Sequence, residues 1–173
     1  MVSIPPPTNE NTSRSMRGNR GKDTSLELAL RSALREAGLS GYRIHWKTPA
    51  GRPDIAYPGK RIAIYVNGCW WHRCAVCKPR MPKSHAEYWN GKFERNIARD
   101  REKQSQLENL GWVVLVVWEC QVRDDLPSCV QTIRMAIAES ERHLREPRPR
   151  AEVDTQPRRC VRTPAKQSRP AQV

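Results

Sequence analysis

Residues Gly51–Cys77 have the sequence GRPDIAYPGKRIAIYVNGCWWHRCAVC, which joins an apolar strand pattern to acidic, sulfur and imidazole side chains. Tyr57-Pro58-Gly59-Lys60 is a turn sequence, because proline fixes one backbone dihedral and Gly59 permits a positive φ. The apolar run Ile62–Val66 follows. We therefore expect a β-hairpin with Asp54 on its first arm and Asn67 at the end of its second. Side-chain and main-chain oxygens would converge there on a hard cation such as Mg²⁺.

The flanking segments predict an α/β domain. Apolar residues at helical spacing predict a helix from Thr24 to Gly38, and Tyr42–Lys47 alternates like a strand. Pro79 and Pro82 mark a loop, and the continuously apolar run Ile62–Val66 suits a central strand covered on both faces. The later elements expected are a long helix at Ser84–Leu110, broken or bent near Gly91, a buried strand at Trp112–Trp118 and an amphipathic helix at Asp125–Leu144. This order predicts a mixed central sheet flanked by helices.

The 173 residues suit one folded domain with extensions at both ends. We expect a basic arm over 1–23, the folded domain over 24–145 and a Pro/Arg-rich tail over 146–173, because neither end has apolar periodicity. No run of about eighteen apolar residues predicts a membrane span. No cleavable leader is recognisable, so the expected compartment is the cytoplasm, where thiols stay reduced.

The net charge of +13 indicates a polyanionic partner. Basic side chains also outnumber acidic ones within 24–145, so the excess is not confined to the ends. Four cations of the arm fall every two or three residues, a spacing that suits a phosphate backbone: Arg14, Arg17, Arg20 and Lys22. The alternatives are a solubilising surface charge and an unstructured leader.

Six cysteines point to metal ligands or free thiols. Cys69, Cys74 and Cys77 have the spacing C-x4-C-x2-C, and Cys120 ends the later buried strand. Four thiolates can close a tetrahedral zinc site. The same spacing also matches a plant-type iron–sulfur pattern, which the visible absorbance of the protein would distinguish from zinc. Two further cysteines are expected to be a packed thiol and a free one, namely Cys129 and Cys160.

Three other positions each have two interpretations. His72 can be a fourth zinc ligand, or it can serve as a general base or a hydrogen-bonding support when Cys120 completes the metal site. Trp70 and Trp71 suit stacking on bases or simple packing around the metal. Glu27 stands three residues after Thr24, the spacing of a helix capping box.

Spaced motifs extend this pattern along most of the chain. GRPD, NGCWWHRC, AEYW at Ala86–Trp89, RNIARDR at Arg95–Arg101 and GWVVLVVWEC at Gly111–Cys120 together resemble the very short patch repair (Vsr) DNA mismatch endonucleases. The similarity runs from about Arg14 to Arg123. It implies a restriction-endonuclease-like core, a structural Zn²⁺ and Mg²⁺-dependent nicking of double-stranded DNA at the thymine of a T:G mismatch left by deamination of 5-methylcytosine. It also implies a monomer at the bacterial nucleoid, with mismatch-repair proteins as further candidate partners.

The resemblance assigns roles to individual residues. Asp54 and the Val66 carbonyl correspond to the Mg²⁺ ligands, His72 to the catalytic histidine and Glu27 to a carboxylate that orients metal-bound water, a role we prefer to simple capping. The zinc positions match Cys69, Cys74, Cys77 and Cys120. The aromatic wedge that enters DNA beside the mismatch matches Trp70, Trp71 and Trp89.

The chain departs from the family pattern at two positions of the site. Cys74 stands where well-known members have histidine, which still suits zinc. Asn67 stands where some members have a histidine that helps to hold water. Asparagine can bond a water but cannot take its proton, so we expect His72 to carry more of the acid–base work. Two alternatives stay open: a related nuclease without a mismatch requirement, and a non-catalytic zinc-stabilised DNA-binding domain.

Overall fold

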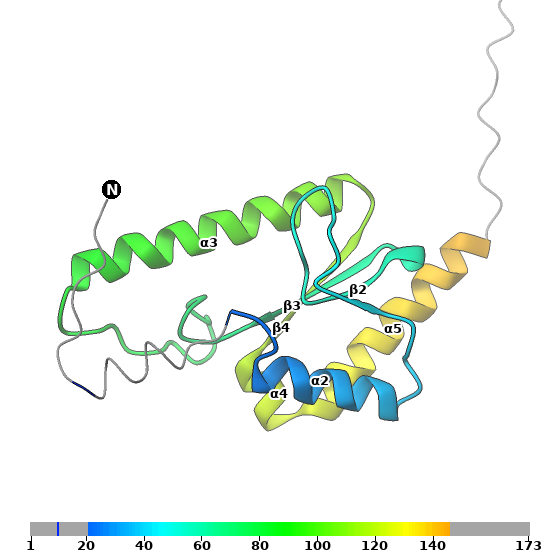
Figure 1. Cartoon of the computed structure of the whole chain (residues 1–173), viewed down its shortest axis with the longest axis horizontal. Helices are drawn as coiled ribbons and strands as arrows, with labels where there is room; N and C mark the ends of the chain where they lie inside the picture. The colour runs from blue at the N-terminus through cyan, green and yellow to red at the C-terminus, as the bar shows by residue number, and fades with distance from the viewer. Residues whose placement is uncertain (1–9, 11–20, 146–173) are drawn as a thin grey trace, which may run out of the picture.

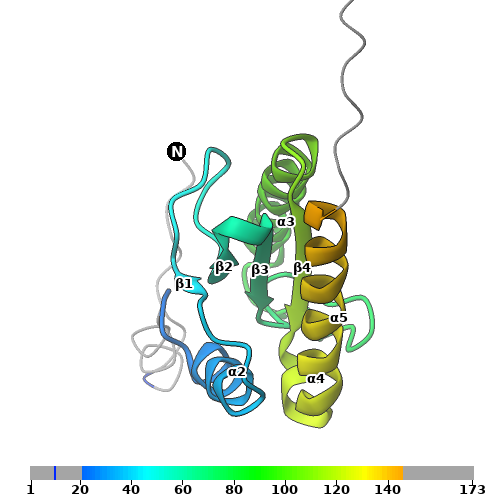
Figure 2. The same ribbon diagram turned by 90° about the vertical axis from the view of Figure 1, so that its right-hand side faces the viewer.

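The computed structural model describes residue 10 and residues 21–145. A four-stranded mixed sheet forms the middle layer (Figure 1), in the order β1 (Arg43–Ile44), β2 (Ile55–Tyr57), β3 (Ile62–Asn67) and β4 (Val113–Trp118) (Figure 2). β2 pairs antiparallel with both β1 and β3, whereas β3 and β4 run parallel. This mixed sheet with helices on its faces confirms the predicted α/β architecture and fits a restriction-endonuclease-like fold.

The hairpin predicted at the centre of the sequence is formed by β2 and β3, with Ile55 opposite Ile64 and Tyr57 opposite Ile62. Its turn is a short 3₁₀ helix, η1 (Pro58–Lys60), which begins at the proline. The expectation that Gly59 would take the positive φ was wrong. Arg61 does so instead, at φ 51°, and its N–H donates to the Pro58 carbonyl at 3.1 Å. The 3₁₀ turn thus moves the chain reversal two residues further on.

Helices cover both faces of the sheet (Figure 2). α2 (Ser25–Glu36), α4 (Glu119–Asp124) and α5 (Leu126–Arg145) lie on one side, and α3 (Ala86–Asn109) lies on the other (Figure 1). α3 runs without a break through Gly91, so of the two possibilities, a break or a bend, the break is not present. α4 is a separate helix that the sequence did not predict, and the first strand is shorter than expected.

The two faces of β3 pack differently. Ile62 and Ile64 are fully buried in the main core, together with Leu30 and Leu34 of α2 and Ile133 of α5. The alternate residues Ala63 and Tyr65 belong to a smaller cluster with Leu107, near the end of α3. α3 is therefore anchored on the sheet by its C-terminal turns. Its N-terminal part extends past the strands, over the loop that carries the cysteines (Figure 1).

Some predicted features fall outside the described residues. These are Arg14, Arg17 and Arg20 of the arm and the whole 146–173 tail with Cys160. Lys22 is described and exposed. Within the described ranges, none of the helices combines the length and apolar character that a bilayer span requires.

Candidate active site and metal centre

A cleft of about 930 Å³ opens where the C-terminal end of β3 meets the start of α2 and the middle of α3. Five residues predicted for the catalytic centre line it together: Glu27, Asp54, Val66, Asn67 and His72. They come from α2, the residue before β2, β3 and the cysteine loop. The structure therefore brings the hairpin carboxylate and the loop imidazole to one cavity.

Asp54 is fixed at the edge of this cleft by the hairpin itself. The Val66 N–H of β3 donates to Asp54 Oδ2 at 2.8 Å. Burial raises the pKa of Asp54, the Val66 hydrogen bond lowers it, and the negative charge of Glu27 raises it further; the net direction is upward. A cation placed beside Asp54 would remove this penalty, so the carboxylate suits a divalent metal ion.

Glu27 forms the capping box that its spacing predicts. Its carboxylate accepts hydrogen bonds from the Thr24 N–H at 3.2 Å and the Thr24 hydroxyl at 2.9 Å, and its own N–H donates to Thr24 Oγ1 at 3.3 Å. The side chain is buried, with His45 Nε2 3.8 Å from its Oε2. Glu27 also lines the cleft, so the capping role and a role toward the site are compatible.

His72 is held by a carboxylate from the opposite wall of the cleft. Its Nδ1 lies 2.5 Å from Oδ2 of Asp100, in the middle of α3. The ring nitrogen that remains for chemistry is therefore Nε2. This is the arrangement of a histidine whose tautomer and orientation are set by an acidic partner.

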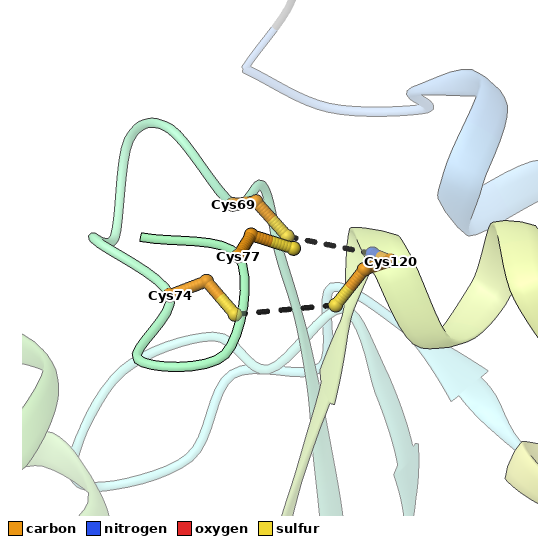
Figure 3. A group of neighbouring side chains, drawn as sticks. All are labelled: Cys69, Cys74, Cys77 and Cys120. Carbon is orange, nitrogen blue, oxygen red and sulfur yellow. Dashed lines mark hydrogen bonds between the residues drawn. The ribbon is translucent and has the colours of Figure 1, made fainter. Parts of the chain in front are cut away.

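Cys69, Cys74, Cys77 and Cys120 form a compact group in which each residue has a sulfur within 4.8 Å of the others (Figure 3). The Cys74 and Cys120 sulfurs are 3.9 Å apart, too far for a disulfide and close to the roughly 3.8 Å edge of a tetrahedral ZnS₄ site. His72 is not a member of this group. Cys120 supplies the fourth thiol, brought in at the start of α4.

The chemistry of this cysteine group also fits a metal ion. Burial raises the pKa of Cys69. Burial also disfavours the Cys74 thiolate, but backbone N–H groups of Cys77 and Val76 lower the pKa of Cys74 overall. Ionising all four sulfurs at such close range would need a shared cation, so the residues present suit a bound metal.

An aromatic cluster joins the cysteine loop to α3. Trp70 lies edge-on to Trp71, Trp89 and Phe93, with ring centroids 4.6, 5.0 and 4.9 Å away. Lys92 Nζ lies 5.3 Å from the centre of the Trp71 ring. Trp71 lines the cleft, whereas Trp89 is 8% exposed and buried within the cluster. Trp71 therefore reaches the cleft, whereas Trp89 packs inside the aromatic cluster.

Cations also line the cleft, namely Arg52, Arg99 and Lys103. None of the three has an ion pair within the described part of the chain. The aliphatic part of Lys103 passes close to Gly51, whose φ of 130° and missing side chain permit this approach. The cleft thus combines an acidic centre with a basic margin.

Sequence comparisons agree with this geometry. Residues 7–78 match the sequence model of the family described as DNA mismatch endonuclease Vsr. The chain is 38% identical over 111 residues to the DNA mismatch endonuclease Vsr of Escherichia coli, covering 64% of this chain and 70% of that protein. It is also similar to the Type II nicking enzyme V.XorIIP of Xanthomonas oryzae, at 42% identity over 61% of this chain and 76% of the relative. The Type II nicking enzyme V.NaeI of Lentzea aerocolonigenes is 38% identical to this chain, over 76% of this chain and 81% of the relative.

The chain belongs to the DNA mismatch endonuclease Vsr family. It is an endodeoxyribonuclease, and its cleft is the candidate centre for phosphodiester hydrolysis. Membership of the Vsr family fits the oxygen-rich cleft, the basic margin and the separate cysteine group in one domain.

Three cleft residues of this Vsr-family endonuclease were missed from the sequence. Asp100 was one of many charges on a long helix, and only its place in RNIARDR could have singled it out. Tyr65 was counted as an apolar strand residue. Glu119 follows β4, lines the cleft and accepts the Cys69 N–H at 2.9 Å on Oε2, tying the cysteine loop to the end of the sheet.

Proposed function

We propose that this Vsr-family endonuclease nicks double-stranded DNA at the thymine of a T:G mismatch, in a Mg²⁺-dependent reaction of very short patch repair. The supporting observation is the shared cleft, which is lined by both Asp54 and the His72–Asp100 pair. A metal-binding carboxylate and an oriented imidazole facing one cavity are the groups that phosphodiester hydrolysis needs.

Asp54 and the Val66 carbonyl are the proposed Mg²⁺ ligands. The bound ion supplies neutralisation of the charge that develops on the phosphate oxygens. The Val66 N–H fixes the direction of the Asp54 carboxylate. Glu27 and Asn67 position water at the same end of the cleft. Although Glu27 accepts three capping hydrogen bonds, two carboxylate oxygens have about four acceptor sites, so capacity for a water remains.

His72 is the proposed general base. Asp100 holds the Nδ1 side of the ring, which leaves Nε2 to take a proton from the attacking water. Asn67 cannot accept that proton at neutral pH. Asp100 acts only through His72 and is a positioning residue.

The cysteine group is proposed to hold a structural Zn²⁺ through Cys69, Cys74, Cys77 and Cys120. Four thiolates leave no open coordination position. The sulfurs all lie within 4.8 Å of one another, which suits one shared ion, whereas a two-iron cluster divides its four cysteines between two irons. The loop from Cys69 to Cys77, which the proposed zinc would hold in place, carries both Trp71 and His72, and both residues line the cleft.

Mismatch selection is proposed to depend on deformability. A T:G pair stacks less well than a matched pair, so unstacking the step beside it costs less free energy. Trp71 would enter the DNA, and Trp70 and Trp89, which contact its ring, would support it. The cleft cations and the arm cations Arg14, Arg17, Arg20 and Lys22 would bind phosphates, with one monomer on each site.

A second candidate is nicking without a mismatch requirement. The names of V.XorIIP and V.NaeI describe Type II nicking enzymes, and the chain resembles them as much as the mismatch endonuclease. The catalytic residues would be the same, and only the preferred duplex would differ.

One nicking assay separates these functions. Duplexes that differ only in a T:G or C:G pair are incubated with the protein in Mg²⁺ or in EDTA, and each strand is labelled separately. Cleavage of the thymine strand of the T:G duplex alone, with Mg²⁺ alone, supports the proposal. Equal cutting of both duplexes supports the second candidate. Binding without cutting would reject a nuclease role for the cleft residues.

A further inference from the structure

The Tyr65 hydroxyl is a buried polar group that has no hydrogen-bond partner among the residues that the structure describes. Three buried side-chain polar atoms lack a hydrogen-bond partner in the described ranges, and they belong to His45, Tyr65 and Arg73. Of these residues, Tyr65 alone lines the catalytic cleft. Leaving a buried hydroxyl without a partner costs free energy, and in native proteins such groups are usually satisfied by ordered water.

The surroundings of Tyr65 are those of a water site. Tyr65 lies on β3 between Ala63 and Asn67 in the strand alternation, on the side that faces α3. Asp54 and Asp100 line the same cleft as Tyr65 and bring two carboxylates to it. Asp100 in turn contacts His72. A water among these groups would have the two to four polar partners that ordered waters need.

We propose that Tyr65 is a positioning residue whose hydroxyl donates a hydrogen bond to a water molecule shared with Asp54 and the His72–Asp100 pair. In the proposed nicking reaction, on which this part of the inference rests, that water is the nucleophile. The site takes a water molecule whether or not DNA is bound.

The Tyr65 hydroxyl would act together with Asp54 and the His72–Asp100 pair, which are already assigned to the reaction. His72 Nε2 takes the proton of the water, the water oxygen forms the new bond to phosphorus, and the bond from phosphorus to the leaving oxygen breaks. The leaving oxygen takes a proton from solvent. Tyr65 keeps its own proton throughout and fixes the direction of the water lone pair. Asn67, two residues along the same face of β3, can hold a second water in the same row.

Tyr65→Phe removes only the oxygen and keeps the ring that packs against Ala63 and Leu107. We expect its single-turnover nicking rate in Mg²⁺ to fall about tenfold, the effect of one lost hydrogen bond, with an unchanged Kd for the duplex. A defect in packing would instead lower the melting temperature and weaken DNA binding as well.

Tyr57→Phe is the matched control. Tyr57 is also a buried tyrosine of the hairpin, but its hydroxyl donates to the Leu39 carbonyl at 2.7 Å, on the other side of the sheet. This variant should lose stability and keep the nicking rate. A crystal structure of the full chain without DNA, beside one of Tyr65→Phe, gives a readout that needs no activity.

A water within hydrogen-bond distance of Tyr65 Oη that is lost in Tyr65→Phe, together with the slower rate, would support the inference. A wild-type crystal structure without such a water, or a Tyr65→Phe rate equal to that of the wild type, would overturn it. If the wild-type protein cuts no duplex, the proposed function fails, and the crystal structures still decide the water site.

Discussion

Two sites start from the same strand end and have opposite chemistry. Asp54, Val66 and Asn67 line an open cavity and carry oxygen atoms of the kind that hard cations prefer. Cys69, two residues beyond β3, begins a closed group of four sulfurs, three of which belong to buried residues. An open oxygen site can admit a phosphate, whereas a closed thiolate site can only hold the chain together. Ligand type and access would therefore separate the proposed reactive site from the proposed structural one within a few residues.

The two sites are also mechanically connected. His72 lies between Cys69 and Cys74, and Glu119 accepts the Cys69 N–H from the cleft side. Holding the cysteine loop thus also places the imidazole. The comparison predicts that damage to the cleft stops chemistry and leaves the fold intact, while damage to the cysteine group affects the fold first and the chemistry through it.

Asp54→Ala should have the largest effect. We expect nicking to fall by about a thousandfold or more, because the proposed metal ligand is lost from the cleft. DNA binding should change little, and the melting temperature should not fall. Single-turnover nicking, a filter-binding Kd and a thermal melt measure these three quantities. The control variant is Asp124→Ala, at an exposed residue of α4. Full activity in Asp54→Ala would remove Asp54 from the site.

Cys120→Ser tests the other site. It should lose the bound zinc and lower the melting temperature by about 10 °C, the shift that corresponds to a loss of roughly 3 kcal/mol in a domain of this size. Zinc stoichiometry and a thermal melt measure these effects. Cys129→Ala is the control, because Cys129 is a buried cysteine of the α5 core outside the metal group. Unchanged zinc content in Cys120→Ser would exclude Cys120 as a ligand.

Asp100→Asn asks whether the cysteine loop alone can place His72. We expect nicking to fall roughly tenfold to a hundredfold, with zinc content and Kd unchanged, because the imidazole loses the carboxylate at its Nδ1. Glu102→Gln, on an exposed side of the same helix, is the control. Wild-type kinetics in Asp100→Asn would mean that the metal-bound cysteine loop is sufficient to orient the His72 imidazole without Asp100.

Local chemistry made much of this molecule predictable. Alternating or continuous apolar runs gave the hairpin and β4, and the spacing of Thr24 and Glu27 gave the capping box. Cysteine spacing predicted a group that the fold brings together. The roles of the residues in catalysis and metal binding stay predictions, and that of Trp89 came from family resemblance alone.

The features that the sequence did not predict mostly depend on contacts between segments that lie far apart in the chain. Asp100 reaches His72 across 28 positions of sequence, and no local pattern separates it from the solvent-exposed charges of α3. Tyr65 looks apolar in a strand until its neighbours are known. The chain reversal at Arg61 depends on how the 3₁₀ turn closes. Side-chain roles that arise only when two elements meet are not encoded in either element alone.

The raised pKa of Asp54 predicts a pH-dependent cost to stability. Burial raises the native pKa above the unfolded value of 3.8, so the native state holds its proton to higher pH than the unfolded chain. Stability should therefore fall as pH rises from the unfolded to the native pKa, and the full cost should be present above that window. In Mg²⁺-free buffer, Asp54→Asn should melt above the wild type at neutral pH, and this difference should vanish below the unfolded pKa. A lower melting temperature for Asp54→Asn at neutral pH would contradict it.

Lys103→Met should have the smallest effect and addresses the basic margin of the cleft. Methionine keeps an unbranched stem beside Gly51 but removes the charge, so we expect a several-fold weaker Kd and a salt slope of log Kd that is lower by about 1. The nicking rate of bound DNA should stay unchanged. Arg142→Met is the charge-matched control, because Arg142 is exposed on α5, which covers the opposite face of the sheet (Figure 1). Equal salt slopes for the two variants would mean that the cleft margin does not contact phosphates, and that the basic charge of the domain acts only at long range.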